Sequence, residues 1–132
     1  MTTRLARWLP VLAWMGLIFF LSAQPDFPKP PARWLDALLS ITAHIMLFAG
    51  LAFLLARAMG ERPWPLAFAL TMLYALGDEF HQSFVPGRCM DPMDLLWDGI
   101  GAGIGLWAWG MYATLNLHDM NPAARRGDEQ GG

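Results

Sequence analysis

The sequence predicts an all-α fold: an integral membrane four-helix bundle with both termini in the cytoplasm. The chain is 55% hydrophobic, only 15% charged, and contains four long stretches without Asp, Glu, Lys or Arg. Soluble domains carry about 25% charged residues. A soluble core of this size could not hide the seven Trp, eight Phe and nine Met of the chain. Since barrel-type alternation is missing from the sequence, we expect helices to cross the bilayer.

The four uncharged stretches define four predicted helices in one domain, residues 1–117. They cover residues 8–25, 37–56, 63–77 and 99–117, and the second is interrupted only by His44. With its flanks, each reaches the roughly 20 residues that a helix needs to cross about 30 Å of hydrocarbon. We therefore expect helices at about residues 8–25, 35–57, 63–84 and 92–117, separated by Pro- and Gly-containing loops. The polar, Gly-rich residues 118–132 are predicted to be a disordered tail.

The first predicted helix has an alternative interpretation as a secretory signal peptide. Arg4 and Arg7 precede its apolar run, and Ser22 and Ala23 follow it. However, the run is long enough to span a bilayer, and the pattern of small residues suits cleavage poorly. We expect this helix to be retained.

The basic residues predict the orientation of the bundle. With the N-terminus in the cytoplasm, six basic residues lie inside and three outside. The inside set is Arg4, Arg7, Arg57, Arg62, Arg125 and Arg126, and the outside set is Lys29, Arg33 and Arg88. A net charge of −2 without a long basic run argues against a nucleic-acid partner. The single Cys89 excludes an internal disulfide, and no Cys/His zinc pattern is present in the sequence.

Polar residues gather at matching depths of three predicted helices. His44 lies in the first half of the second helix, Asp78 near the end of the third, and Asp98 near the start of the fourth. Because consecutive helices run antiparallel, these positions come to one side of the bilayer, the extracytoplasmic side in the predicted orientation. The candidate polar site comprises His44, Asp78, Glu79, His81, Gln82, Arg88, Asp94 and Asp98. An uncompensated Asp78 would cost about 2.5 kcal/mol or more, so we expect His44, His81 or Arg88 to face it.

Several of these residues also have a purely structural interpretation. Asp91 before a proline is typical of a helix N-cap, and Asp94 either belongs to the site or favours the helix dipole. Glu79 either joins the site or faces interfacial water, whereas Arg88 is favoured as a functional or bracing ion pair. The glycines at 99, 101, 103 and 105 contain two overlapping GxxxG spacings and predict close helix packing.

The sequence resembles the VanZ-like family over roughly residues 10–112. The resemblance rests on the segment DEFHQSFVPGR at residues 78–88 and on the spacing of Asp91, Asp94 and Asp98 that follows. The segment FLSAQP at residues 20–25 and the surroundings of His44 are also similar. One departure is Ile41, at a position where family members often carry Lys. The resemblance implies a small, multi-pass protein of the bacterial inner membrane, with a link to teicoplanin resistance through the member that names the family.

The residues leave three functions open, in a fixed order of preference. The first is binding of a polar lipid headgroup or a lipid-linked envelope precursor, with Arg88 holding an anionic group. The second is an intramembrane lipid hydrolase or phosphotransferase that uses His44 or His81 as a base. The third is a small proton- or ion-coupled transporter.

The sequence also suggests a cation and a second subunit. Any metal would be Mg²⁺ or Ca²⁺ on the oxygen ligands of Asp78, Glu79 and Asp94. The Gly-rich fourth helix suggests a homodimer interface.

Overall fold

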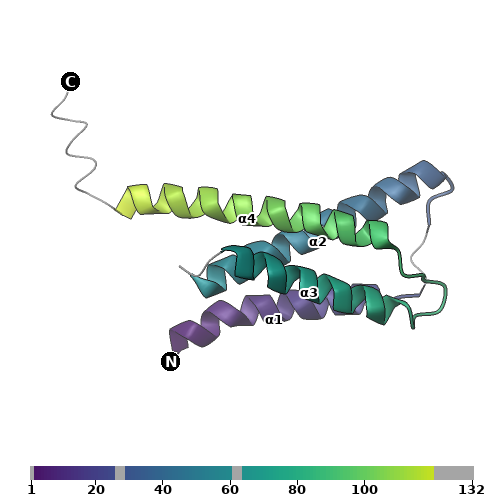
Figure 1. The fold of residues 1–132 in the computed structure, drawn as a ribbon, viewed down its shortest axis with the longest axis horizontal. Helices are drawn as coiled ribbons and strands as arrows, with labels where there is room; N and C mark the ends of the chain where they lie inside the picture. The colour runs from purple at the N-terminus through teal and green to yellow at the C-terminus, as the bar shows by residue number, and fades with distance from the viewer. Residues whose placement is uncertain (1, 26–28, 61–63, 121–132) are drawn as a thin grey trace, which may run out of the picture.

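The computed structural model describes residues 2–25, 29–60 and 64–120 and forms four α-helices within them. They are α1 (Thr2–Ser22), α2 (Arg33–Met59), α3 (Trp64–Gln82) and α4 (Pro92–Met120). The start of α1 and the end of α4 lie at one end of the bundle, and the α3–α4 connection lies at the other end (Figure 1). The all-helical fold predicted from the sequence is therefore confirmed.

The helix boundaries differ from the predicted ones by a few residues. α1 begins six residues before the predicted residue 8 and ends at Ser22, before the Gln24–Pro25 pair that disfavours helix. α2 ends at Met59, and the following Gly60 has a φ of 69°, which glycine adopts readily, while its amide donates to the Ala56 carbonyl. α4 continues to Met120, past the predicted helix end at residue 117 and into the predicted tail. The rest of that predicted tail, residues 121–132, lies outside the described residues.

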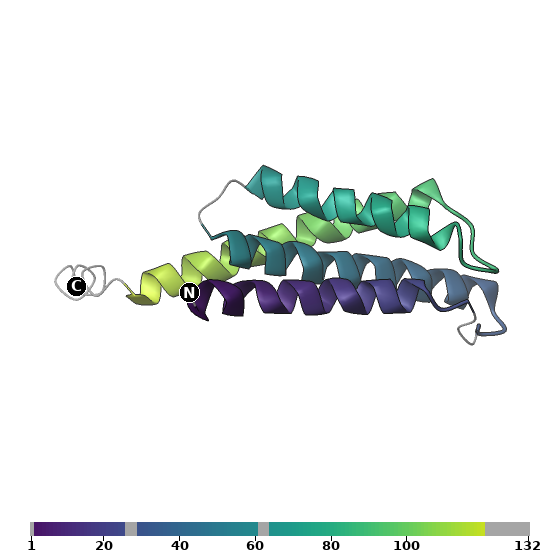
Figure 2. The same ribbon diagram turned by 90° about the horizontal axis from the view of Figure 1, so that it is seen from below.

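The central helix is α2, which contacts each of the other three helices and contacts α4 most extensively (Figure 2). Two glycines of α4 make this close approach possible. A Cβ atom at Gly101 would collide with the backbone of Ile45, and one at Gly105 would collide with the backbone of Ala49. The predicted role of these glycines in close packing is thus fulfilled within the chain.

Two side-chain hydrogen bonds tie the middle of α1 to its neighbours. The Trp14 indole donates to the Leu47 carbonyl of α2 at 2.8 Å. The Tyr74 hydroxyl of α3 donates to the Met15 carbonyl of α1 at 2.7 Å. Because each bond reaches a backbone oxygen in a helix interior, α1 is held in one position against α2 and α3.

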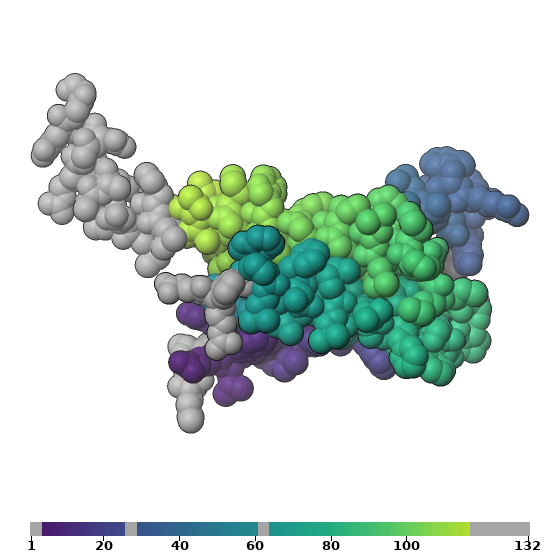
Figure 3. All heavy atoms as spheres, viewed as in Figure 1, coloured from purple at the N-terminus to yellow at the C-terminus, as the bar shows by residue number. Residues whose placement is uncertain are grey.

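The outer surface of the bundle is strongly apolar. Large hydrophobic side chains are exposed on every helix, among them Leu9, Trp34, Leu73 and Trp107. The first turns of α2 also stand clear of the other helices (Figure 3). A water-soluble monomer rarely exposes so much continuous apolar surface.

Among the described residues, two helices are long and apolar enough to cross a membrane. They are Arg4–Ser22 and Arg33–Met59, with mean hydropathies of 1.6 and 2.2. The buried share of their most apolar stretches is only 17% and 22%, whereas the core helix of a soluble protein would be mostly buried. α3 and α4 do not meet this criterion.

Candidate functional site

The predicted polar residues lie at the end of the bundle where α3 leads into α4. The turn between these helices is tight: the Arg88 amide donates to the Val85 carbonyl at 3.1 Å. Gly87 in this turn has a φ of 79°, a conformation that L-residues with a side chain rarely adopt. The turn continues into an N-cap, because the Met93 amide donates to Asp91 Oδ1 at 2.9 Å. The predicted capping role of Asp91 is confirmed.

On one side of α3 lies an acid–histidine cluster, formed by His44, Glu79, Asp94 and Asp98. The His44 imidazole lies between two carboxylates of α4: Nδ1 is 2.8 Å from Asp98 Oδ1, and Nε2 is 3.6 Å from Asp94 Oδ2. Glu79 and Asp98 are each only 1% exposed. Buried carboxylates this close together cannot all keep an uncompensated negative charge. A bound proton or a cation must therefore neutralise part of that charge.

Glu79 is held in this cluster through one of its two oxygens. Oε2 accepts a hydrogen bond from the Asp91 backbone amide at 3.2 Å. Oε1 is buried and has no hydrogen-bond partner among the described residues. The interpretation that Glu79 faces interfacial water is therefore wrong, because helix packing encloses the side chain.

On the other side of α3 lies a second group, the groove cluster, formed by Ser22, Asp78, Gln82 and Arg88. The Ser22 hydroxyl donates to Asp78 Oδ2 at 2.7 Å, and the Gln82 amide donates to the same oxygen at 3.0 Å. Asp78 Oδ1 is buried without a hydrogen-bond partner in the described part of the chain. Asp78 was expected to be compensated by His44, His81 or Arg88, and its hydrogen bonds instead come from Ser22 and Gln82.

Arg88 braces the groove cluster rather than pairing with Asp78 through a hydrogen bond. Its Nε donates to the Gln24 carbonyl at 3.1 Å, and one terminal nitrogen donates to Gln82 Oε1 at 3.2 Å. The arginine thus connects the segment after α1 to the end of α3. It also fixes the Gln82 amide that donates to Asp78.

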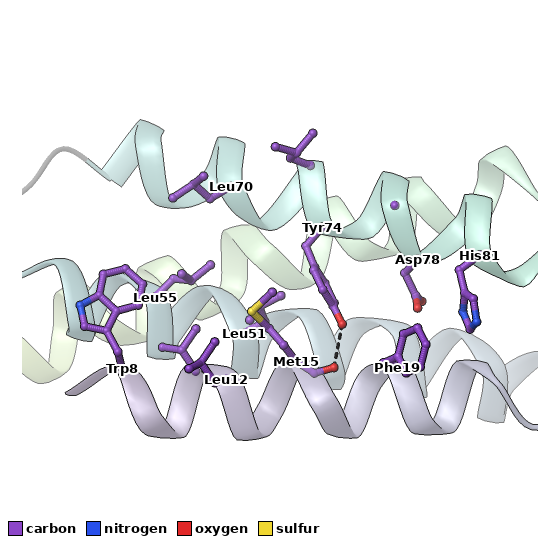
Figure 4. A pocket seen from close by; sticks show the side chains of 13 residues that line it. Trp8, Leu12, Met15, Phe19, Leu51, Leu55, Leu70, Tyr74, Asp78 and His81 are labelled. Carbon is purple, nitrogen blue, oxygen red and sulfur yellow. Dashed lines mark hydrogen bonds between the residues drawn. The ribbon is translucent and has the colours of Figure 1, made fainter. Parts of the chain in front are cut away.

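A groove of about 490 Å³ runs between α1 and α3 and ends at Asp78 and His81 (Figure 4). Trp8 lies at the opposite end, and the walls between are apolar side chains such as Leu12, Met15, Leu51, Leu55 and Leu70. The His81 ring stacks on Phe19 with a centroid separation of 4.4 Å. Its Nδ1 is buried and has no partner within the described ranges. The groove therefore combines a long apolar wall with two polar groups at one end.

The eight predicted site residues thus lie at one end of the bundle, where their contacts divide them into two groups. His44, Glu79, Asp94 and Asp98 join α2, α3 and α4. Asp78 and Arg88 instead contact Ser22 and Gln24 at the end of α1, and Gln82 bonds to both of them. His81 lies beside Asp78 on the groove. Of the residues expected to hold a cation, Glu79 and Asp94 lie in the acid–histidine cluster, but Asp78 bonds on the other side.

Sequence reasoning missed the contribution of α1 to the site. Ser22 and the Gln24 carbonyl are partners of Asp78 and Arg88, whereas the sequence suggests for this segment only a possible cleavage site and a family resemblance. A polar Ser–Ala–Gln sequence at the end of an apolar helix could have indicated this role. It falls at the same depth as Asp78 once the helices are taken as antiparallel.

Comparison with known families identifies the family of the chain. The family model described as VanZ/LLP1 matches residues 7–113, which include most of α1 and α4 and all of α2 and α3. The comparisons with curated proteins and with solved structures give no match. Because the family model covers well over half of the 132 residues, the chain belongs to the VanZ/LLP1 family.

Proposed function

We propose that this protein is a multi-pass membrane protein of the bacterial cell envelope that binds an amphipathic lipid in the groove between α1 and α3. Family membership and the two candidate spans indicate a membrane protein. The observation that carries the proposal is the groove itself, whose walls are mostly apolar and whose end is formed by Asp78 and His81. The one hydroxyl along its described walls, that of Tyr74, is already bonded to the Met15 carbonyl. An acyl or isoprenoid chain fits such walls, and a headgroup fits the polar end.

The polar end also suggests the chemistry of the headgroup. Asp78 Oδ1 is a buried acceptor without a partner among the described residues, so a hydroxyl or ammonium group that donates a hydrogen bond would satisfy it. Ser22 and Gln82 hold the other oxygen and thereby fix the carboxylate for this contact. Sugars of lipid-linked envelope precursors and aminated phospholipids both carry such donors. A role in teicoplanin resistance would follow from binding a precursor of this kind.

Copurifying lipid provides the test of this proposal. The protein purified in a mild detergent should retain a lipid that native mass spectrometry detects. Gly77 lines the groove, and Gly77→Leu should displace this lipid by filling the space. Gly110→Leu is the matched control, because a side chain there also meets open space but lies outside the groove lining. Equal lipid occupancy in wild type and Gly77→Leu would refute binding in the groove.

The proposed topology has four spans, a retained first helix and both termini in the cytoplasm. The start of α1 and the end of α4 lie at the same end of the bundle, which supports an even number of crossings. Three side-chain contacts of α1 with α2 and α3 support its retention in the folded protein. Alkaline-phosphatase and fluorescent-protein fusions after residue 120 should report a cytoplasmic location. Phosphatase activity at that position would contradict the orientation.

A second candidate function, intramembrane hydrolysis or phosphoryl transfer, is favoured by one specific observation. The 2.8 Å contact between His44 Nδ1 and Asp98 resembles the carboxylate–imidazole pairs that orient a general base. Turnover of an added phospholipid by the wild type, abolished in His44→Gln while the copurified groove lipid is retained, would establish it. Unchanged lipid after prolonged incubation would exclude this reaction for that lipid.

A further inference from the structure

We propose that His44, Glu79 and Asp98 bind a divalent transition-metal ion, with Asp94 as a positioning residue. This site belongs to the acid–histidine cluster, on a different face of α3 from Asp78. It does not depend on lipid binding in the groove. Its three ligands come from α2, α3 and α4, so an ion here would tie these helices together.

The geometry of the three side chains suits a shared ion. One potential ligand atom from each of His44, Glu79 and Asp98 lies within 4.8 Å of the other two. Metal–ligand bonds of about 2.0–2.2 Å hold ligand atoms roughly 3 Å apart. His44 Nδ1 and Asp98 Oδ1 are already 2.8 Å apart. A shift of the Glu79 carboxylate toward these two atoms would complete the set.

The burial of Glu79 distinguishes this cluster from an ordinary group of acidic residues on a protein surface. Glu79 is only 1% exposed, and its Oε1 has no hydrogen-bond partner among the described residues. A buried carboxylate oxygen without a partner destabilises the fold, because it has lost its hydrogen bonds to water and no protein donor replaces them. A cation bound at Oε1 supplies the missing partner and balances the neighbouring charge of Asp98.

Asp94 lies just beyond hydrogen-bonding distance of His44, so a small approach would give His44 the support that metal-bound histidines usually have. When one ring nitrogen binds a metal, the other commonly donates its hydrogen to a carboxylate. Here Nδ1 faces Asp98, and Nε2 faces Asp94 Oδ2 at 3.6 Å. The ion would replace the proton between Nδ1 and Asp98, and the ring would keep its Nε2 proton for Asp94.

The mixture of ligands predicts which ions bind. An imidazole nitrogen with carboxylate oxygens suits Zn²⁺ or Mn²⁺, whereas Mg²⁺ and Ca²⁺ prefer oxygen ligands alone. This differs from the sequence-based expectation of Mg²⁺ or Ca²⁺ on Asp78, Glu79 and Asp94. The difference arises because Asp78 Oδ2 accepts hydrogen bonds from Ser22 and Gln82, while His44 enters the cluster instead.

The test is metal titration of the full chain purified in detergent and stripped with a chelator. Isothermal titration with Zn²⁺, Mn²⁺, Mg²⁺ and Ca²⁺ should show one equivalent of Zn²⁺ or Mn²⁺ and weaker binding of the other two. Glu79→Gln and Asp98→Asn should abolish this binding, and Asp94→Asn should weaken it about tenfold. Asp91→Asn is the matched control and should bind as the wild type does, because only its backbone amide contacts Glu79.

Two results would overturn the proposal. One is a wild-type protein that binds none of these ions stoichiometrically, or binds only Mg²⁺ or Ca²⁺. The other is a Glu79→Gln variant that is folded and binds metal as tightly as the wild type. If a variant fails to fold, adding Co²⁺ to the wild-type protein still tests the site. The visible absorption of a bound Co²⁺ ion of low symmetry is expected. The spectrum of aqueous Co²⁺ would contradict the site. A metal ion bound to His44 Nδ1 would compete with the proposed role of His44 as a general base, so the same titration also tests that role. Its outcome does not affect the proposal of lipid binding in the groove.

Discussion

The two faces of α3 near its end place neighbouring carboxylates in different environments. Asp78 faces α1 and ends an apolar groove, where Ser22 and Gln82 satisfy one of its oxygens. Glu79 faces α2 and α4, where it lies close to His44 and Asp98. Consecutive helical residues point about 100° apart, so one turn of helix serves two sites of different chemistry.

The comparison shows how few residues are needed to separate a lipid site from a charged one. The groove side has an apolar wall and one carboxylate held by neutral donors, which suits an amphipathic ligand. The acid–histidine side is closed by helix packing and concentrates three carboxylates on one imidazole, which suits a cation. The helix α3 thus separates the two, and changes on one side should leave the other working.

The largest effect is expected from the packing that closes the acid–histidine side. Gly105→Leu would force a side chain into the Ala49 backbone and separate α4 from α2. Overpacking of this kind costs about 3 kcal/mol or more, and the variant should unfold at a much lower temperature or aggregate. In Gly110→Leu the new side chain enters open space, so the variant should retain wild-type thermal stability. Size-exclusion chromatography after heating measures how much of each variant stays unaggregated. Equal stability of the two variants would show that α2 and α4 do not pack closely.

A medium effect is expected on the groove side from Arg88→Lys. Arg88 donates from two nitrogens to Gln24 and Gln82, and a lysine cannot reach both acceptors with a planar fork. We expect a loss of about 1 kcal/mol of stability and reduced lipid retention, because Gln82 no longer holds Asp78. Metal affinity should remain at the wild-type value. A selective loss of metal instead would mean that Arg88 supports the other side of α3.

The smallest effect is expected from Asp91→Asn, which lies between the two sites. Asparagine caps a helix about as well as aspartate, and the Asp91 backbone amide that reaches Glu79 is unchanged. Thermal stability, metal binding and lipid retention should all be close to wild type. A large loss in any of them would indicate that the Asp91 charge itself matters.

The sequence predicted the helices, and it predicted that the polar residues lie at the same end of the bundle, for clear physical reasons. Uncharged stretches determine where helices cross an apolar layer, and antiparallel order determines which ends meet. The cap at Asp91 and the packing of Gly101 and Gly105 also follow from local patterns that do not need distant partners.

The separation of Asp78 from Glu79 could not be predicted from the same patterns. Helical phase indicates that two neighbouring residues diverge, but it does not indicate which neighbouring helix each will meet. That depends on the packing of α1 against α3, through contacts such as the Tyr74 hydroxyl to the Met15 carbonyl. The partner Ser22 is 56 residues away in sequence from Asp78, and only the tertiary fold brings the two together.

The most direct test of this division compares Asp78→Asn and Glu79→Gln in parallel, with lipid and metal measured on the same preparations. Each substitution removes one charge and keeps the shape of the side chain. Asp78→Asn should lose the copurified lipid and keep one equivalent of Zn²⁺ or Mn²⁺, while Glu79→Gln should keep the lipid and lose the metal. If both variants are folded and lose both ligands together, the two faces of α3 form a single site, and the account is contradicted.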